Sequence, residues 1–132
     1  MPESPPYFSV IIPVLNGSLT LDACLQSLAH QTFQNFEVLL VDGGSTDRSA
    51  ELLQTHPGLN ARLLIKPGTG IFTAMNVGID QARGEWLYFM GCDDRLFAPD
   101  TLARAYAVLC TTACHWAAGR VRLPESNLVS SP

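Results

Sequence analysis

The fold is decided by residues 8–47, which read FSVIIPVLNGSLTLDACLQSLAHQTFQNFEVLLVDGGSTD. This stretch opens with a nearly continuous apolar run, FSVIIPV (8–14), of β-branched character. Such a run is typical of a strand that is covered on both faces, as in a parallel sheet. Apolar side chains then recur at helical spacing and predict a helix over about residues 18–31. A second buried strand is predicted over FEVLLV (36–41).

The alternation of strand and helix continues along the chain. The further predicted elements are a helix that Ser45 caps and that ends towards His56, a strand over 61–65, a helix over 71–82, a strand over 86–90, a helix from Pro99 to about Leu109 and a candidate fifth strand over 115–123. No hairpin signal interrupts the pattern. The predicted fold class is therefore α/β, a mostly parallel sheet flanked by helices with right-handed crossovers. Ligands of such sheets bind beyond the carboxyl ends of the strands.

The length of 132 residues is that of one compact domain. We expect a flexible N-terminus (1–7), one domain (8–123) and a polar tail (124–132). The N-terminus has no basic start and no apolar core, so we expect no signal peptide. No apolar run reaches the roughly 18 residues that a membrane span needs. The expected compartment is the cytoplasm.

Charge and cysteine content exclude several classes of partner. The chain carries 8 basic and 12 acidic residues, for a net charge of −4, and Lys66 is its only lysine. This balance argues against nonspecific binding to nucleic acid or to an anionic membrane surface. The four cysteines form no CxxC pair and have no cluster of soft ligands beside them, so we expect reduced thiols rather than a zinc site.

Three common motifs of α/β enzymes are absent. The first predicted strand is followed by LNGSL rather than GxGxxG, and neither GxxxxGK[ST] nor GxSxG occurs. These absences remove dehydrogenases, ATPases and hydrolases of the usual kinds. What remains is a set of acidic residues in the loops that follow the strands.

The first acidic loop begins at Asp42, which ends the second predicted strand and precedes Gly43 and Gly44. Two glycines let the backbone take unusual dihedral angles and let a flat ligand approach closely. A carboxylate at this point can accept hydrogen bonds from a base N–H or a ribose hydroxyl. The alternative is that Asp42 only caps the helix that follows.

The second acidic loop contains Asp93 and Asp94, after the fourth predicted strand. Paired carboxylates repel each other unless solvent or a cation neutralises them. A hard cation such as Mg²⁺ or Mn²⁺ takes one or two carboxylates together with substrate phosphate oxygens. This pair is consistent with a metal-bound diphosphate at the sheet edge, or with one of the two aspartates starting the next helix.

Several motifs in register resemble those of the family 2 glycosyltransferases, which have the GT-A fold, a Rossmann-like nucleotide-sugar-binding architecture. They are Pro13-Val-Leu-Asn16, Gln31-Thr32, Asp42-Gly-Gly-Ser-Thr-Asp47 and GIFTAMNVGIDQARGEWLYFMGCDD (70–94). The resemblance runs from about residue 8 to residue 109. It implies an enzyme that binds a nucleotide-sugar donor and transfers the sugar, usually with inversion, to a glycan or lipid-linked acceptor in polysaccharide or glycolipid synthesis.

The resemblance also implies roles for individual residues. Pro13, Leu15 and Asn16 would line the nucleotide pocket, and Asp42 with Gly43 would contact the base or ribose. The segment from Gly70 to Asn76 would lie near the sugar–phosphate. Asp93 and Asp94 would hold Mg²⁺ or Mn²⁺, with one of them on the ribose or on the same cation.

The sequence departs from the family pattern at four positions and in length. Leu15 replaces the usual Tyr, Gly43 replaces a second Asp, and Gly91 stands where an Asp-x-Asp motif has its first carboxylate. Thr73 replaces an acidic or polar residue. Complete catalytic domains of the family are longer, and their second half supplies the acceptor site and the catalytic base. We therefore expect a truncated, donor-binding half whose base is not in this chain. The alternative is a catalytically incomplete nucleotide-binding or interaction module, a fragment or degenerate copy. An exposed half-fold surface would favour homo-oligomers.

Overall fold

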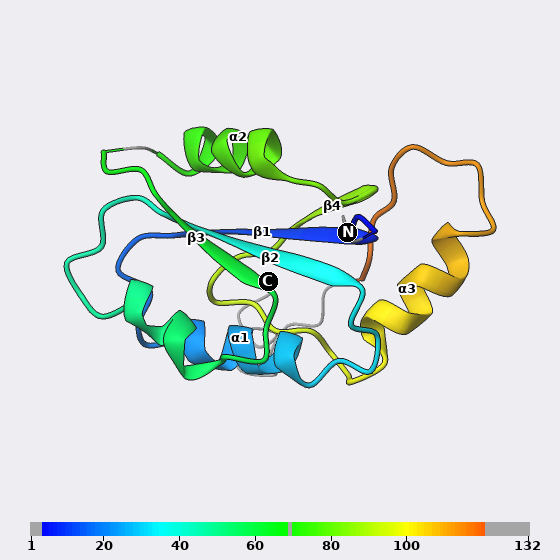
Figure 1. Cartoon of the computed structure of the whole chain (residues 1–132), viewed down its shortest axis with the longest axis horizontal. Helices are drawn as coiled ribbons and strands as arrows, with labels where there is room; N and C mark the ends of the chain where they lie inside the picture. The colour runs from blue at the N-terminus through cyan, green and yellow to red at the C-terminus, as the bar shows by residue number, and fades with distance from the viewer. Residues whose placement is uncertain (1–3, 69, 121–132) are drawn as a thin grey trace, which may run out of the picture.

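The computed structural model describes residues 4–68 and 70–120. The elements, in chain order, are β1 (Phe8–Val14), α1 (Leu21–Ala29), β2 (Phe36–Asp42), the 3₁₀ helix η1 (Ala50–Thr55), β3 (Ala61–Ile65), α2 (Ile71–Gln81), β4 (Trp86–Phe89) and α3 (Thr101–Leu109) (Figure 1). The strands form a four-stranded sheet in the order β3-β2-β1-β4, and every neighbouring pair is parallel. The predicted α/β class with a parallel sheet is confirmed.

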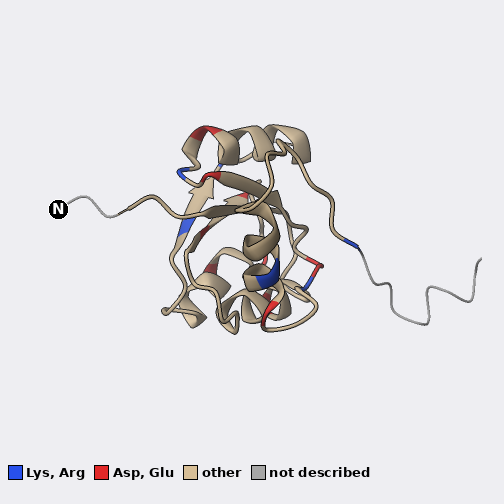
Figure 2. Cartoon of the chain, turned by 90° about the vertical axis from the view of Figure 1, so that its right-hand side faces the viewer, with Lys and Arg blue, Asp and Glu red and all other residues tan. Residues whose placement is uncertain are grey.

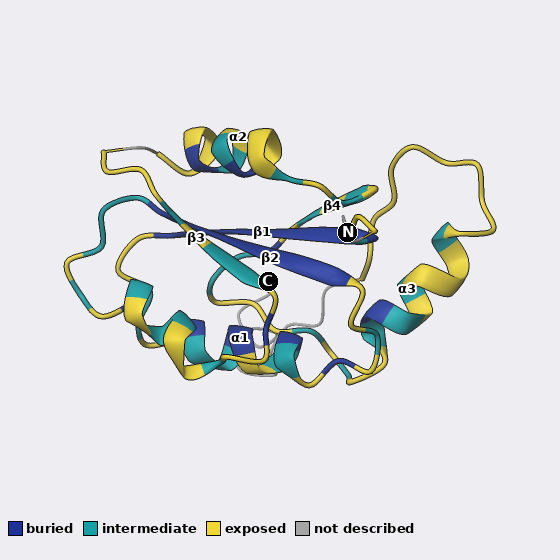
Figure 3. Cartoon of the chain, viewed as in Figure 1, coloured by how far each residue is buried: buried dark blue, intermediate teal, exposed yellow. Residues whose placement is uncertain are grey.

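The sheet is the middle layer of the molecule. Helix α2 covers one face, and α1, η1 and α3 lie at the other (Figure 1). Strands β1 and β2 are buried along their whole length, as their continuous apolar runs predict (Figure 3). The larger core lies on the α1 face, where alternate residues of β1 and β2, such as Val10, Ile12 and Leu40, pack against Leu21, Leu25 and Leu28 of α1.

On the opposite face, a glycine allows α2 to lie close to β1. A Cβ on Gly78 would lie 2.5 Å from Cγ2 of Ile11. Real Cβ atoms do not come that near, so the helix sits at a distance that only glycine permits. Ala74, one turn earlier on the same side of α2, is also buried.

A buried polar network fastens the end of α2 to the sheet. Ser9 and Glu37 are register partners in β1 and β2, and their exposed fractions are 0% and 4%. The Ser9 hydroxyl donates to Oε2 of Glu37 at 2.6 Å, and the Arg83 N–H donates to the same oxygen at 2.7 Å. The Gly84 N–H donates to Oγ of Ser9 at 2.8 Å, and Nη2 of Arg62 lies 3.4 Å from Oε1 of Glu37. These bonds determine where the chain leaves α2 and enters β4.

The structure corrects two predicted elements. The segment towards His56 is a 3₁₀ helix, and its N-cap is Ser49 rather than Ser45. Residues 45–49 are held in loop hydrogen bonds and Pro57 follows closely, so only a short stretch remains, which suits a 3₁₀ helix. The second correction concerns the candidate fifth strand. Its described part, residues 115–120, is exposed and pairs with no strand, and residues 121–123 lie outside the described residues.

The segment just before β1 is bonded to the rest of the domain. Tyr7, expected in the flexible N-terminus, is buried and bonded through its backbone to Asn35 and Trp86. The expected polar tail, 124–132, lies outside the described residues. Basic residues and acidic residues are each distributed over several helices, strands and loops (Figure 2). Among the described residues, no helix is long and apolar enough to cross a membrane.

Candidate functional site

The carboxyl ends of the parallel strands lie at one edge of the sheet, on the left in Figure 1. Pro13 is buried in β1 beside Val41, whereas Leu15, just past the strand, is 59% exposed. Asp42 is the last residue of β2 and pairs with Val14. The loop with Asp93 and Asp94 follows β4, on the other side of β1. The structure thus brings most of the predicted site residues to this edge.

Asp42 is buried, and its hydrogen bonds fall on one oxygen. Its exposed fraction is 3%. Oδ1 accepts the N–H of Gly44 at 3.0 Å and the N–H of Ser45 at 2.7 Å. Gly44 has a φ of 106°, a left-handed conformation that favours glycine and turns its N–H back towards the carboxylate. Within residues 4–68 and 70–120, Oδ2 makes no hydrogen bond and remains available as an acceptor.

Gly43 is held between two neighbouring segments. Its N–H donates to the carbonyl of Val14 at 2.9 Å, and its carbonyl accepts the N–H of Gly68 at 3.1 Å. The N–H of Lys66 donates to the Asp42 carbonyl at 2.8 Å. A Cβ on Gly44 would lie 3.4 Å from Cα of Pro67. The loop after β3 therefore lies directly against the two glycines.

Asn16 joins the loop after β1 to the loop after β2. It has a φ of 52°, and its N–H donates to Oγ of Ser45 at 2.9 Å. Its Oδ1 accepts the N–H of Thr46 at 2.8 Å, the Thr46 hydroxyl at 3.3 Å and the N–H of Asp47 at 3.3 Å. The side-chain oxygen is therefore used inside the protein. The prediction that Asn16 lines the nucleotide pocket stays a prediction.

Asp47 and Ser49 continue the same junction, and sequence analysis assigned neither of them a role. The N–H of Ser18 donates to Oδ2 of Asp47 at 3.1 Å, and the N–H of Gly17 donates to Oγ of Ser49 at 2.9 Å. Oδ1 of Asp47 accepts both the N–H and the hydroxyl of Ser49. The signal in the sequence was the string Ser-Thr-Asp, since Ser, Thr and Asp side chains readily bond nearby backbone groups.

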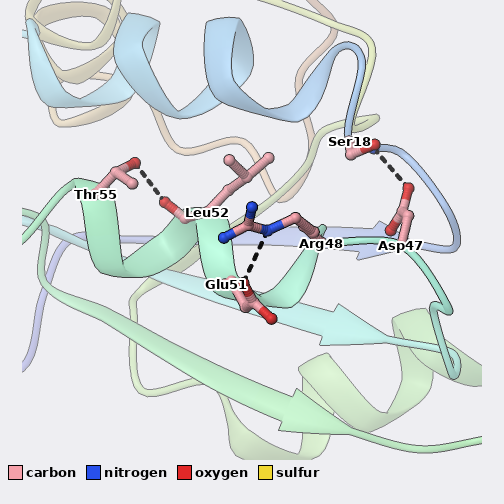
Figure 4. Close-up of a pocket in the computed structure, with 6 residues that line it drawn as sticks. All are labelled: Ser18, Asp47, Arg48, Glu51, Leu52 and Thr55. Carbon is pink, nitrogen blue, oxygen red and sulfur yellow. Dashed lines mark hydrogen bonds and ion pairs between the residues drawn. The ribbon is translucent and has the colours of Figure 1, made fainter.

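Figure 4 shows the Ser18–Asp47 bond at the rim of a shallow, open pocket. The pocket lies between the loop after β1 and η1, and it contains none of the predicted site residues. Its lining residues are Ser18, Asp47, Arg48, Glu51, Leu52 and Thr55.

Hydrogen bonds, first from Ser49 and then from Ser18, together lower the pKa of Asp47 from 3.8 to about 2. A depressed pKa favours folding above the unfolded value of 3.8, and this contribution is lost as the pH falls towards 2. We therefore predict that Asp47→Asn destabilises the chain most above pH 4. The difference in free energy of unfolding from wild type should shrink between pH 4 and pH 2 in urea titrations. A difference that does not vary over that range would contradict the assignment.

Asp93 and Asp94 lie in a tight turn and are exposed. The N–H of Asp94 donates to the Gly91 carbonyl at 3.1 Å, and Oδ2 of Asp94 accepts the Gly91 N–H at 3.0 Å. A Cβ on Gly91 would lie 2.8 Å from Oδ1 of Asp93 and 2.9 Å from Oδ2 of Asp94. Both carboxylates thus flank Gly91, and a side chain at that position would displace them. A Cβ on Gly17 would lie 2.8 Å from Sγ of Cys92, so this turn touches the loop after β1.

The negative charge of this turn acts on buried neighbours. Burial is the main cause that raises the pKa of Cys24 to about 12, with smaller contributions from Cys92, Asp94 and Asp93. The pKa of Tyr88 is also raised, first by burial and then by Asp94. A cation beside the two aspartates would relieve this field.

The donor set fits a hard cation that shares its coordination with a ligand. Two carboxylates supply hard oxygens, as Mg²⁺ and Mn²⁺ prefer. Within residues 4–68 and 70–120, no group of three or more His, Cys, Asp or Glu side chains is placed to hold a metal alone. Phosphate oxygens of a bound nucleotide would complete such a site.

The two remaining predicted residues lie on α2. Gly70 is its N-cap, with an extended backbone, and its carbonyl accepts the N–H of Ala74. It follows the loop that lies against Gly43. Asn76 is exposed, whereas Ala74 and Gly78 face the sheet. The structure therefore brings Gly70 towards the strand-end loops and places Asn76 on the outer side of the helix.

The fold and this edge define a class of protein, the glycosyltransferases with the GT-A fold. The sequence profile of the family described as "Glycosyl transferase family 2" matches residues 9–129. The chain belongs to this family. Both the predicted fold and the resemblance seen in the sequence are confirmed.

Individual relatives agree with this assignment. A "PGL/p-HBAD biosynthesis glycosyltransferase" of Mycobacterium tuberculosis is 50% identical over 107 residues, which is 79% of this chain and 42% of that protein. The structure of S. aureus TarS 1-349 in complex with UDP matches with a TM-score of 0.74 at 33% identity, over 79% of this chain and 32% of that one. The mannosyltransferase PcManGT of Pyrobaculum calidifontis, in complex with GDP-Man and Mn²⁺, matches with a TM-score of 0.70 at 29% identity, over 77% of this chain and 32% of that one. The chain thus spans less than half the length of these relatives.

Proposed function

We propose that this chain is the donor-binding part of a family 2 glycosyltransferase. It binds a nucleoside diphosphate sugar at the carboxyl edge of the sheet with Mg²⁺ or Mn²⁺. The intact protein transfers the sugar to a glycan or lipid-linked acceptor in polysaccharide or glycolipid synthesis. The observation that carries the proposal is the buried Asp42, whose second oxygen has no hydrogen bond within the described residues and lies beside two glycines at this edge.

Asp42 and its neighbours suit the nucleoside. Oδ2 of Asp42 would accept a hydrogen bond from a base N–H or a ribose hydroxyl. Gly43 and Gly44 present backbone without side chains, which leaves room for a flat base. Leu15 is 59% exposed at the same edge and offers an apolar surface for that base. Pro13 is buried in β1 and would support the loop that carries Leu15 rather than contact the base.

Asp93 and Asp94 suit the diphosphate. Strands β2 and β4 flank β1, and neighbouring strands lie about 4.8 Å apart, so the strands that lead into the two acidic loops are about 10 Å apart. An extended nucleoside diphosphate can bridge such a distance. A bound cation would supply Lewis-acid stabilisation of the leaving nucleoside diphosphate. Gly70 lies at the start of α2 and follows the loop after β3. We propose that Gly70 and Asn76 lie near the sugar–phosphate of the donor.

The transfer itself is proposed for the intact protein. Inverting transfer needs a carboxylate base that takes the proton of the acceptor hydroxyl. We assign none of the described carboxylates to that role, because Asp42, Asp93 and Asp94 serve the donor in this account. Donor binding is therefore the activity we propose for the chain itself.

Calorimetric titration of the chain with UDP, GDP, TDP and CMP, with and without Mn²⁺, tests this function. We expect one nucleotide to bind, with an affinity that Mn²⁺ raises. In the double variant Asp93→Asn, Asp94→Asn, the enhancement by Mn²⁺ should be lost, whereas Asp80→Asn, an exposed carboxylate on α2, should leave it unchanged. A folded chain that binds none of the four nucleotides would contradict the proposal and favour an interaction module.

The exposed edge of β4 favours association between copies of the chain as a second property. Strand β4 is an edge strand, and Leu87 and Phe89 on it are 38% and 41% exposed. Exposed apolar edges promote association between chains. We predict that the mass measured by light scattering rises with concentration and that Phe89→Lys reduces the rise. A monomer at all concentrations would contradict this prediction.

A further inference from the structure

The loop that follows Asp42 is bonded to the loop after β1 through three consecutive backbone N–H groups. The N–H groups of Asn16, Gly17 and Ser18 donate to side-chain oxygens of Ser45, Ser49 and Asp47 respectively, at 2.9, 2.9 and 3.1 Å. In the other direction, Oδ1 of Asn16 accepts the N–H groups of Thr46 and Asp47. We call this set of bonds, over residues 16–18 and 45–49, the loop junction.

Asp47 occupies the centre of the loop junction. One of its oxygens accepts the Ser18 N–H, and the other accepts the N–H and hydroxyl of Ser49. The Ser49 oxygen in turn accepts the Gly17 N–H, and Ser49 is fully buried. Both carboxylate oxygens of Asp47 are thus engaged within the protein. A positioning role uses these bonds as they stand.

The loop junction is connected directly to the Asp42 carboxylate. Ser45 donates its N–H to Oδ1 of Asp42 at 2.7 Å, while its hydroxyl oxygen accepts the Asn16 N–H. A displacement of residues 45–49 would therefore move one of the two N–H groups that orient Asp42. Charge-assisted bonds of this kind depend strongly on alignment.

We propose that Asp47, with Ser49, is a positioning residue that orients Asp42 for the nucleoside without touching the ligand. This assignment rests on the proposed function. It separates two contributions to affinity: the loop junction serves the nucleoside, whereas Asp93 and Asp94 serve the metal-bound diphosphate. In Asp47→Asn, an amide nitrogen replaces one of the two carboxylate oxygens. It then faces the N–H of Ser18 or of Ser49, so residues 45–49 must shift.

The test measures nucleotide affinity with and without Mn²⁺ in Asp47→Asn and Ser49→Ala. We expect the Kd of the preferred nucleoside diphosphate from the four-nucleotide panel to rise about tenfold in Asp47→Asn. The rise should be equal with and without Mn²⁺, because Asp93 and Asp94 make no bond to the residues of the loop junction among those described. The matched control is Glu51→Gln, which removes a neighbouring carboxylate that is 60% exposed and paired with Arg48 on the surface. It should leave both constants unchanged.

A second readout follows the backbone. Hydrogen exchange of the Gly44 and Ser45 amides, which bind Asp42, should accelerate in Asp47→Asn and in Ser49→Ala while the α1 core stays protected. If Asp47→Asn does not fold, Ser49→Ala carries both measurements. Unchanged affinity and exchange in a folded variant would overturn the assignment, as would a loss confined to the Mn²⁺ enhancement. Absence of nucleotide binding by the wild-type chain would overturn the proposed function and this assignment with it.

Discussion

Replacing Asp42 with asparagine will lower nucleotide affinity by about ten- to a hundredfold and leave the fold intact. The asparagine carbonyl can still accept the N–H groups of Gly44 and Ser45, which now bind Oδ1 of Asp42. The amide nitrogen takes the place of Oδ2, so an acceptor with negative charge becomes a donor. Hydrogen bonds to charged groups contribute about 1.5–3 kcal/mol, which corresponds to the loss we expect. Calorimetry and thermal unfolding together measure both effects.

The matched control for this variant is Asp80→Asn, which removes one negative charge from the exposed side of α2. It should bind nucleotide as the wild type does. If Asp42→Asn were folded and bound with wild-type affinity, the free carboxylate oxygen would not be part of the site. The account of nucleoside recognition would then be wrong even if Mn²⁺ dependence remained.

The second large effect concerns stability. We predict that Glu37→Ala lowers the free energy of unfolding by about 3–5 kcal/mol, the usual cost of removing one partner from a buried ionic network. The variant leaves the Ser9 hydroxyl and the Arg83 N–H without their acceptor, in a region where Glu37 is 4% exposed. Urea denaturation of the chain measures the change.

Two further variants separate the charge of Glu37 from its shape. Glu37→Gln keeps an acceptor for Ser9 and should cost less than Glu37→Ala. Glu51→Ala, at an exposed ion pair with Arg48, should change stability by less than about 1 kcal/mol. A loss for Glu37→Ala as small as that for Glu51→Ala would show that the network does not hold α2 to β4.

The two ends of the sheet therefore have different tasks. At the amino end, Ser9 and Glu37 use their polar groups entirely within the protein. At the carboxyl end, one oxygen of Asp42 has no hydrogen bond from the part of the chain that the structure describes, and Asp93 and Asp94 are exposed. Polar groups that the fold does not satisfy for itself are the ones available to a ligand, and in a parallel sheet they gather at this edge.

The strands and the acidic loops could be predicted from the sequence because their signals are local. A continuous apolar run identified β1 and β2, and glycines after Asp42 identified the loop. The candidate strand over 115–123 is not seen in its described part, residues 115–120, which pairs with no strand. A local sequence can be compatible with a strand, but strand formation also depends on a neighbouring strand to pair with.

The loop junction and the Glu37 network could not be predicted because their partners are far apart in sequence. Asn16 bonds to residues about thirty positions away, and Arg83 bonds to Glu37 across 46 positions. The parallel register of β1 with both β2 and β4 brings these groups together. The family resemblance implied that Asn16 lines the nucleotide pocket, which stays a prediction, whereas its bond to Thr46 appears only in three dimensions.

The central claim is that one edge of the sheet holds a cation and a nucleotide together. Mn²⁺ is paramagnetic and broadens nearby amide signals in an NMR spectrum of the labelled chain. With UDP or GDP present, small additions of Mn²⁺ should first broaden the signals of residues 91–94 and of Gly17, which lies against Cys92. The signals of Arg83 and Gly84, at the opposite edge, should stay sharp. Broadening centred elsewhere, or none at all with nucleotide present, would contradict the account.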